Sequence, residues 1–153
     1  MKYWFLNSEP KDYSIDDLER DRVAIWDGVR NYQARNFLRQ MQPGDRAFFY
    51  HSNTKPPGIV GLAKVIRGDI VDPTQFDPED KHYDPKATPE NPRWQTVEIE
   101  WIEKFPRLIS ISELKENFSG DEFLVVKRGN RLSVMPVAET VAQQILELTV
   151  KPH

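Results

Sequence analysis

The sequence predicts an α+β fold in which short strands curl into a small β-barrel and short helices lie outside it. Two kinds of segment indicate this fold: short stretches in which apolar and polar residues alternate, and stretches with helical spacing that begin at capping residues. They follow one another in the order β-α-β-α-β-β-loop-β-α-β-α. Short antiparallel strands bury their apolar faces economically by closing into a barrel. At 153 residues, the chain is expected to form a single domain over residues 1–150, with a tail over 151–153.

The first strand and the first helix are predicted from local signals. Residues 3–6 (YWFL) are apolar and end at the turn-forming Ser-Glu-Pro. Ser14 is the predicted N-cap of a helix over residues 14–20, and Asp17 stands at the third helical position, where it completes a capping box. An extended segment is expected at 23–26, and it ends at an Asp-Gly pair.

A second helix is predicted from Asn31 to Met41, because apolar residues recur at helical spacing and a Pro-Gly pair ends the pattern. Two apolar-rich strands are expected after it, over residues 45–52 and 58–66. A proline-stiffened loop, NTKPP, separates them. Gly61 within the second of these strands indicates a bulge or a close approach of another backbone.

Residues 68–93 differ from the rest of the chain, with five prolines, many acidic residues and few aliphatic ones. An irregular segment of this length inside a compact domain is uncommon, and it is usually functional or disordered. Phe76, Tyr83 and Trp94 are expected to anchor it, which favours an ordered loop. The alternation in residues 94–105 then predicts a half-buried strand.

The last part of the chain is predicted to return to helix. Ser110 and Glu113 have the spacing of a capping box, which predicts a helix over residues 111–117. Two short extended pieces are expected after it, over residues 123–126 and 131–134. A final helix is expected to begin at Pro136 and to end near Leu148.

The composition excludes several classes of protein. No apolar run approaches the roughly 20 residues that span a bilayer, so no membrane association is expected. The N-terminal apolar run of about four residues is too short for the core of a signal peptide, and there is no cysteine. These features favour a cytoplasmic, bacterial-type or nucleoid-associated location. A net charge of −3 argues against non-specific nucleic-acid binding by the whole surface.

The sequence offers no recognisable catalytic or metal-binding motif. The three histidines are far apart, and there is no H-E-x-x-H spacing, G-x-S-x-G motif or P-loop. No catalytic residue, no metal and no cofactor is therefore predicted.

Trp26 is the residue that most strongly suggests a binding site. It precedes an Asp-Gly pair and the start of the second helix, so an aromatic wall would lie beside directed backbone donors and acceptors. Such an arrangement suits a flat heteroaromatic ring, on which stacking is worth about 1–3 kcal/mol per base. From the residues alone, packing of Trp26 in the core is the other interpretation, and an isolated tryptophan usually packs there. If Trp26 walls such a pocket, Trp26→Ala would remove the preference for the ligand and leave the melting temperature nearly unchanged.

Arginines gather in the same region. Four arginines and one aspartate lie between positions 22 and 39, which gives this segment a charge of +3 in a chain of −3. Arg35 and Arg39 share one helical face. The cluster is open to two interpretations, phosphate contact and an ordinary solvated helix face.

Several strings of residues resemble the EVE domain family, which includes the thymocyte nuclear protein group and has a PUA-like fold. Asn7 departs from the pattern, because the family commonly has lysine before Ser-Glu-Pro. The matching strings run in order over nearly the whole chain: 8-SEP-10, 13-YSIDDL-18, 26-WDGVRNYQARNFL-38, 43-PGDRAFFYHSN-53, 57-PGIVGLAKV-65, 83-YDP-85, 91-NPRW-94 and 132-LSVMPV-137.

The resemblance implies a PUA-like barrel of five or six strands and a non-catalytic partner of nucleic acid that carries a modified base. EVE domains are similar to YTH domains, which hold N6-methyladenine of RNA in an aromatic cage, and they are thought to read modified bases, particularly cytosines in DNA, after base flipping. By this resemblance Trp26 is a cage residue, and Ser8, Glu9 and the backbone of Asp27 contact the base edge. Trp94 and Trp101 are assigned to the core. Further groups for the base edge would be Asn31, Ser52, Asn53 and Asp84. The second cage aromatic would be Tyr83. Phosphate contacts would come from Arg30, Arg35 and Arg93.

Three alternatives remain open from the sequence. The first is a reader of modified bases in RNA. The second is a PUA-like hydrolase acting on RNA or nucleosides, with Glu9, His51 and Asp84 as acid–base candidates. The third is a protein-interaction module that docks through residues 72–88. The choice of base modification and the oligomeric state are not predicted.

Overall fold

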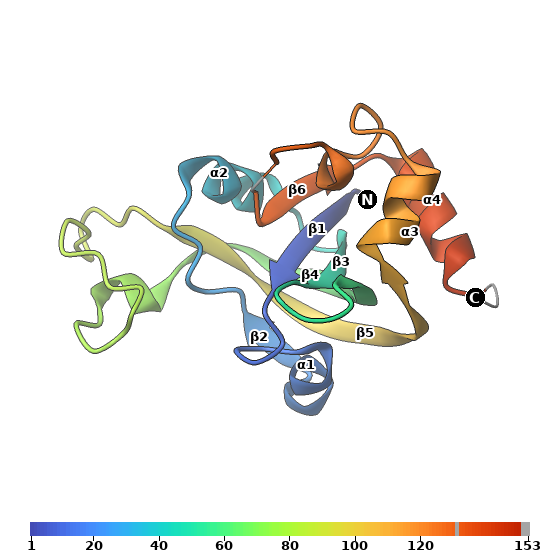
Figure 1. Ribbon diagram of the computed structural model, residues 1–153. Coiled ribbons are helices and arrows are strands. Elements are labelled where there is room, and N and C mark those ends of the chain that lie inside the picture. The colour runs from blue at the N-terminus through green and yellow to red at the C-terminus, as the bar shows by residue number, and fades with distance from the viewer. Residues whose placement is uncertain (131, 151–153) are drawn as a thin grey trace.

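The computed structural model describes residues 1–130 and 132–150, and their elements follow the predicted order (Figure 1). The tail expected at 151–153 lies outside the described residues. The elements are β1 (Tyr3–Ser8), α1 (Ile15–Asp21), β2 (Val23–Ile25), α2 (Tyr32–Gln40), β3 (Arg46–His51), β4 (Gly58–Val71), β5 (Gln95–Ser110), α3 (Ile111–Asn117), β6 (Val134–Val137) and α4 (Glu139–Leu148), with single 3₁₀ turns η1 (Pro73–Phe76) and η2 (Leu124–Val126).

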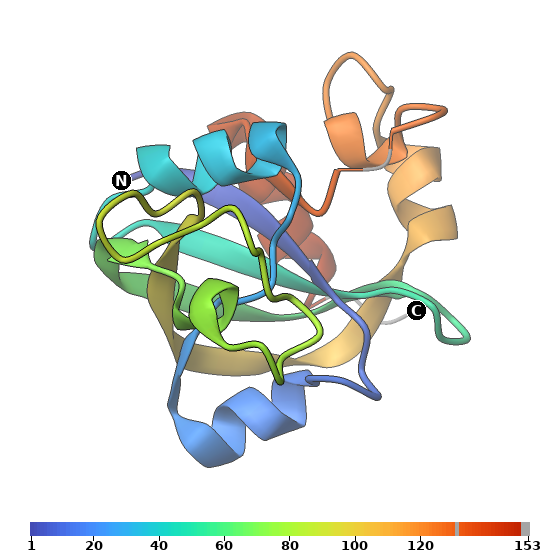
Figure 2. The same ribbon diagram turned by 90° about the vertical axis from the view of Figure 1, so that its left-hand side faces the viewer.

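The six strands form one mixed sheet in the order β2-β5-β4-β3-β1-β6. The α+β class is as predicted, but the expectation of purely antiparallel strands is wrong for β1 and β3, which pair in parallel with Tyr3 opposite Arg46. The intervening α1, β2 and α2 form the crossover that a parallel pair requires. Register shifts along β4 and β5 bend the sheet. Helix α2 contacts the edge strand β6 and also β4 and β5, so it bridges strands from opposite halves of the curled sheet (Figure 2).

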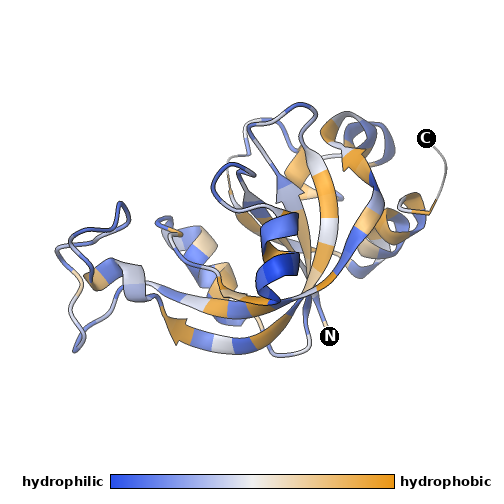
Figure 3. Ribbon diagram, turned by 90° about the horizontal axis from the view of Figure 1, so that it is seen from below, coloured by the Kyte–Doolittle hydropathy of each residue, from blue (hydrophilic) through white to orange (hydrophobic). Residues whose placement is uncertain are grey.

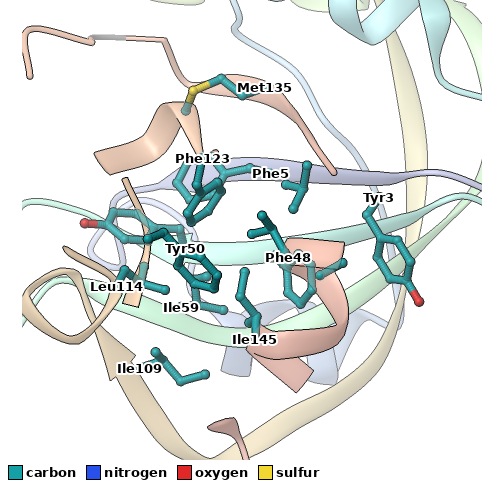
Figure 4. Packing of buried hydrophobic residues seen from close by; sticks show 14 of the residues in the cluster. Tyr3, Phe5, Phe48, Tyr50, Ile59, Ile109, Leu114, Phe123, Met135 and Ile145 are labelled. Carbon is teal, nitrogen blue, oxygen red and sulfur yellow. The ribbon is translucent and has the colours of Figure 1, made fainter. Parts of the chain in front are cut away.

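The sheet is buried on both faces, with one apolar cluster on each side. Successive residues of β1 alternate between them: Phe5 packs in the cluster covered by α3 and α4, and Trp4 and Leu6 in the cluster covered by α1 and α2. In β3, Phe48 and Phe49 divide in the same way. Figure 4 shows the first of these clusters. Burial on both faces explains why these strands read as continuous apolar runs.

The predicted helix caps are present. The Ser14 hydroxyl accepts a hydrogen bond from the Asp17 amide at 3.1 Å, and the Asp17 carboxylate accepts one from the Ser14 amide at 2.9 Å. The Asn31 side chain accepts from the Ala34 amide at 2.9 Å, and the Ser110 hydroxyl from the Glu113 amide at 3.1 Å. Caps are local interactions, which is why the sequence predicts these helix starts.

The region before the last helix departs from prediction. Pro136 does not begin a helix but lies in β6 opposite Trp4, and α4 begins at Glu139. β6 is an edge strand, where a residue without an amide hydrogen is tolerated. Of the extended piece expected at 131–134, only Val134 lies in a strand, and Arg131 lies outside the described residues. The piece expected at 123–126 is instead the turn η2.

The long loop is shorter than predicted and ordered. β4 continues to Val71 and β5 begins at Gln95, which leaves residues 72–94 as the irregular segment. The loop projects away from the sheet (Figure 1), and most of its residues are hydrophilic (Figure 3). Tyr83, expected to anchor it, is 40% exposed.

Gln75 holds this loop together, and no sequence pattern indicated it. Its side chain is fully buried and donates to the carbonyls of Asp72 at 2.8 Å and Trp94 at 2.9 Å. Its carbonyl oxygen accepts from the amides of Arg93 and Trp94 at 2.9 and 3.1 Å. Gln75 thus closes the base of the loop by hydrogen bonds to its two ends.

Candidate functional site

A pocket of about 1120 Å³ lies where the end of β1, the loop from β1 to α1, the loop from β2 to α2 and part of the long loop meet. Segments far apart in the sequence form its walls, and the long loop faces the viewer in Figure 2. The lining residues are Asn7, Ser8, Glu9, Lys11, Asp12, Tyr13, Asp21, residues 23–30, residues 79–82 and Ser133.

Trp26 is both a core residue and part of the pocket lining. Its amide donates to the Val97 carbonyl at 2.9 Å, and its carbonyl accepts from the Thr96 hydroxyl. The indole meets Phe49 edge-on at 5.4 Å and is only 8% exposed. Core packing and pocket wall are therefore not alternatives. The expectation that Trp26→Ala leaves stability unchanged conflicts with this burial, since removal of a packed aromatic typically costs about 3–5 kcal/mol.

Gly28 gives the pocket a tight turn that no other residue fits. Its φ of +83° is a conformation that residues with a side chain rarely adopt. The His82 imidazole packs against it so closely that a Cβ atom would lie 2.6 Å from the ring. The amide of Gly28 donates to the Asp72 carboxylate at 2.9 Å. The turn after Trp26 is thus fixed to the long loop at two points.

Arg30 is committed to contacts within the protein. Its guanidinium donates to the Asp72 carboxylate at 3.1 Å, the His82 carbonyl at 2.9 Å and the Thr74 hydroxyl at 2.9 Å. It also lies over the Trp94 ring at 5.2 Å. Arg30 therefore joins the turn after β2 to the long loop, and phosphate contact would require it to give up these partners.

Asp72 receives hydrogen bonds from both sides of this junction. Burial alone would raise the pKa of its carboxyl, but hydrogen bonds from Thr74, Gly28 and Arg30 outweigh burial and hold the pKa below its ordinary value. The carboxylate is thus ionised at neutral pH and holds the loop in place.

The charge of the pocket is negative. Its lining contains six carboxylates and three basic side chains, counting Arg30. Asp27 is an exposed residue, but partial desolvation of its carboxyl, and then the neighbouring Asp72, raise its pKa, so this carboxyl holds its proton more tightly than usual. Such a pocket favours a neutral or donor-bearing ligand over a phosphate group.

Glu9 is a pocket carboxylate with only long contacts to the rest of the protein. Lys11 lies 3.9 Å from it, and the Asn53 amide donates to it at 3.5 Å. Ser8, its neighbour, donates its hydroxyl to the Tyr13 carbonyl at 2.6 Å. Glu9 therefore retains capacity to accept hydrogen bonds from a ligand, whereas the Ser8 hydroxyl is already used as a donor.

Several residues expected in the pocket lie elsewhere. Asn31 caps α2, Ser52 lines a second pocket, and Asn53 contacts Glu9 without lining the first pocket. Asp84 accepts from the Trp94 indole at 2.8 Å, and the exposed Tyr83 is not part of the lining. Of the nine residues expected to read the base, the pocket contains Ser8, Glu9, Trp26 and Asp27.

Arg35 and Arg93 also lie outside the pocket lining. Arg35 donates to the Arg93 carbonyl at 3.0 Å, and both guanidinium groups lie over the ring of Tyr32, at 4.7 and 5.9 Å. Tyr32 in turn stacks on Trp94 at 4.8 Å. Trp94 is buried as expected, whereas Trp101 is only partly buried. The stack joins α2 to the end of the long loop.

The acid–base trio of the hydrolase alternative is not assembled. Only Glu9 of the three lines the pocket. His51 accepts a hydrogen bond from the Ile15 amide at the start of α1 at 3.1 Å, and burial lowers its pKa. Across residues 1–130 and 132–150, no group of three or more acidic, histidine or cysteine side chains is placed to hold a metal ion.

Tyr13, Asp72 and His82 were missed from the sequence. Tyr13 and His82 line the pocket, and the Tyr13 hydroxyl donates to the Asp21 carboxylate at 2.9 Å. His82 stands next to Tyr83, which the sequence favoured, but only the path of the loop decides which of the two rings faces the pocket. No local pattern marks Asp72, because its partner Arg30 is far away in the sequence.

Comparison with known proteins gives a consistent result. The family model of the EVE domain matches residues 2–148. Thymocyte nuclear protein 1 of Gallus gallus is 39% identical over 99% of this chain and 70% of that protein. The structure of human THYN1 in complex with DNA containing 5-methylcytosine superimposes with a TM-score of 0.92 at 37% identity, and covers 100% of both chains.

The fold also extends to a more distant protein. The Mmi1 YTH domain, solved with RNA, superimposes with a TM-score of 0.56 at 12% identity over 97% of this chain and 77% of that one. At this identity the likeness concerns the fold alone, and it agrees with the expected PUA-like class. No helix in the described part of the chain is long and apolar enough to cross a membrane.

Proposed function

This chain belongs to the EVE domain family, and we propose that it binds nucleic acid and reads a modified base, specifically a modified cytosine in DNA turned out of the helix into the pocket beside Trp26. It does so by binding, without turnover. The complex of the human relative with DNA that contains 5-methylcytosine supports both the partner and the base.

The observation that carries this proposal is the joining of Trp26, Glu9 and Asp27 in one pocket. A tryptophan provides an aromatic surface, and a carboxylate accepts a hydrogen bond from an exocyclic amino group such as N4 of cytosine. The excess of carboxylates in the lining disfavours phosphate in the pocket but suits the amino edge of a neutral base.

The free energy of binding must exceed the cost of extruding the base, which is a few kcal/mol. Stacking returns about 1–3 kcal/mol. Because Trp26 is only 8% exposed, a base can stack fully on it only if neighbouring side chains move aside. Tyr13 and His82 line the same pocket and are the candidates for a second ring against the base, in place of Tyr83.

The methyl group of a modified cytosine requires an apolar contact. Ala24, Ile25 and Val29 line the pocket beside Trp26 and supply apolar side chains. Burial of one methyl group contributes about 0.8 kcal/mol, so 5-methylcytosine is expected to bind about fourfold more tightly than cytosine by this contact alone.

Fluorescence anisotropy with matched oligonucleotides tests the proposal. Short duplexes with one central cytosine, 5-methylcytosine or 5-hydroxymethylcytosine are compared with RNA that contains N6-methyladenine. We expect the modified duplexes to bind most tightly, and Glu9→Gln to reduce binding of every cytosine form. Glu90→Gln, an exposed carboxylate outside the pocket lining, is the matched control. Equal affinity for modified and plain duplexes contradicts the proposal, and a preference for the RNA supports the RNA alternative.

A further inference from the structure

A second pocket, of about 650 Å³, lies on the other side of Asn7. Its walls come from the ends of β1 and β3, the start of α3, residues 125–130 and Leu132. Asn7 lines both pockets, so the two pockets adjoin at this residue. A polymer whose base enters the first pocket therefore has a neighbouring unit close to the second.

The charge of the second pocket is opposite to that of the first. Lys115, Lys127 and Arg128 line it, and no acidic residue is among its described lining residues. All three basic residues are exposed, and within residues 1–130 and 132–150 none of them forms an ion pair. Arg30 and Arg93, in contrast, have carboxylate neighbours at 3.1 and 3.8 Å. The second pocket thus holds basic side chains that no carboxylate neutralises in the part of the chain that the structure describes.

Polar and apolar groups complete this pocket in a way that suits a sugar–phosphate unit. Ile111, Val125 and Leu132 supply apolar side chains against which sugar carbons can pack. Tyr50 also lines this pocket, and its hydroxyl lies at the outer side of the apolar cluster in Figure 4, where it adds a polar group.

We propose that the second pocket binds a sugar–phosphate unit of the same strand, next to the nucleotide in the first pocket, with Lys115, Lys127 and Arg128 contacting its phosphate. This inference rests on the proposed function and assigns the phosphate contacts to residues other than Arg30, Arg35 and Arg93. The acidic pocket takes the neutral base and the basic pocket takes the anionic backbone.

The salt dependence of binding tests this assignment. A short duplex with a central 5-methylcytosine and its unmodified counterpart are titrated at salt concentrations between about 50 and 200 mM. The slope of log K against log salt is negative, and each lost phosphate contact reduces its magnitude by about 0.9. We expect Lys127→Ala with Arg128→Ala to reduce this magnitude by about 1–2 and to weaken both duplexes by the same factor. Arg39→Ala, an exposed arginine of α2, is the control and should leave the slope unchanged.

The outcomes separate the two proposals. An unchanged slope in the Lys127/Arg128 variant, or an equal change in Arg39→Ala, overturns the assignment of the second pocket even if modified DNA is preferred. A reduced slope with equal binding of modified and plain duplexes supports the second pocket and contradicts base reading. Melting temperatures of the variants should match the wild type, because the substituted side chains are exposed. If they do not, Lys115→Ala provides the same slope measurement from a different element.

Discussion

Arg30 and Asp72 form an ion pair at 3.1 Å in which the carboxylate side chain is 2% exposed and the guanidinium side chain 21%. The pair joins the turn that follows Trp26 to the first residue of the long loop. Arg30 lay in the basic cluster that the sequence singled out for phosphate contact. Its burial against Asp72 makes it a residue that shapes the pocket.

Arg30→Ala is expected to destabilise the protein by about 3 kcal/mol, because it leaves a buried carboxylate without its charged partner. Asp72→Asn costs less than this, and a double-mutant cycle should give a coupling energy of about 1–3 kcal/mol. Denaturant unfolding measures all four proteins. Arg20→Ala, which removes an exposed ion pair with Asp17, should change stability little. A coupling energy near zero would contradict the role given to the pair.

Acid should weaken the fold through Asp72. Since the folded-state pKa of this carboxyl lies below its ordinary value of about 3.9, its contribution is complete above pH 4 or so and is lost as pH falls toward the folded pKa. Asp72→Asn should therefore be less stable than wild type at pH 7, with the difference shrinking on acidification. Thermal melts between pH 2 and 7 test this, and a difference that stays constant with pH would refute it.

Gly28→Ala should be more damaging than Gly44→Ala, although both glycines have positive φ, +83° and +96°. Gly44 has open space where the methyl group of an alanine would stand, so its substitution costs only backbone strain of about 1 kcal/mol. Gly28 adds the collision with His82. We expect at least twice the loss of stability, and partial recovery in the double variant Gly28→Ala with His82→Ala. Equal losses at the two glycines would show that the His82 contact is unimportant.

Asp27→Asn should stabilise the protein at neutral pH. Asp27 is an exposed residue, but partial desolvation of its carboxyl, and then Asp72, raise its folded-state pKa, so the fold disfavours its ionised form by a small amount. That penalty is absent below about pH 4 and is complete once pH exceeds the folded pKa. The melting temperature of the variant should therefore exceed that of wild type at pH 7 and equal it near pH 3. A gain at both pH values would have a cause other than this charge.

Trp26 substitutions should separate packing from ligand binding. Trp26→Ala is expected to lower stability by about 3–5 kcal/mol, because the indole packs edge-on against Phe49. Trp26→Phe keeps a ring in the core and should cost less, while it reduces the stacking surface for a base. We expect Trp26→Phe to remain folded by circular dichroism and to show a smaller preference for 5-methylcytosine. An unchanged preference would remove Trp26 from the base site.

The sequence alone determined the starts of the first three helices, the order of the elements and the family. Caps such as Ser14 and Asn31 act within three or four residues, and apolar periodicity is read over a single element, so both are visible without the fold. The WDGVRNYQARNFL string likewise placed Trp26 and Asp27 at a site, and both line the pocket.

Only the tertiary structure decided which side chains meet around Trp26. Asp72 and His82 lie 44 and 54 residues from Gly28, and they reach it through the base of a loop closed by the fully buried Gln75. The same long-range contacts occupy Arg30, whereas Lys127 and Arg128 have no ion-pair partner among the described residues. Hydrogen bonds and charges between segments so distant leave no periodic trace in the sequence, because their partners are neighbours only once the sheet has folded.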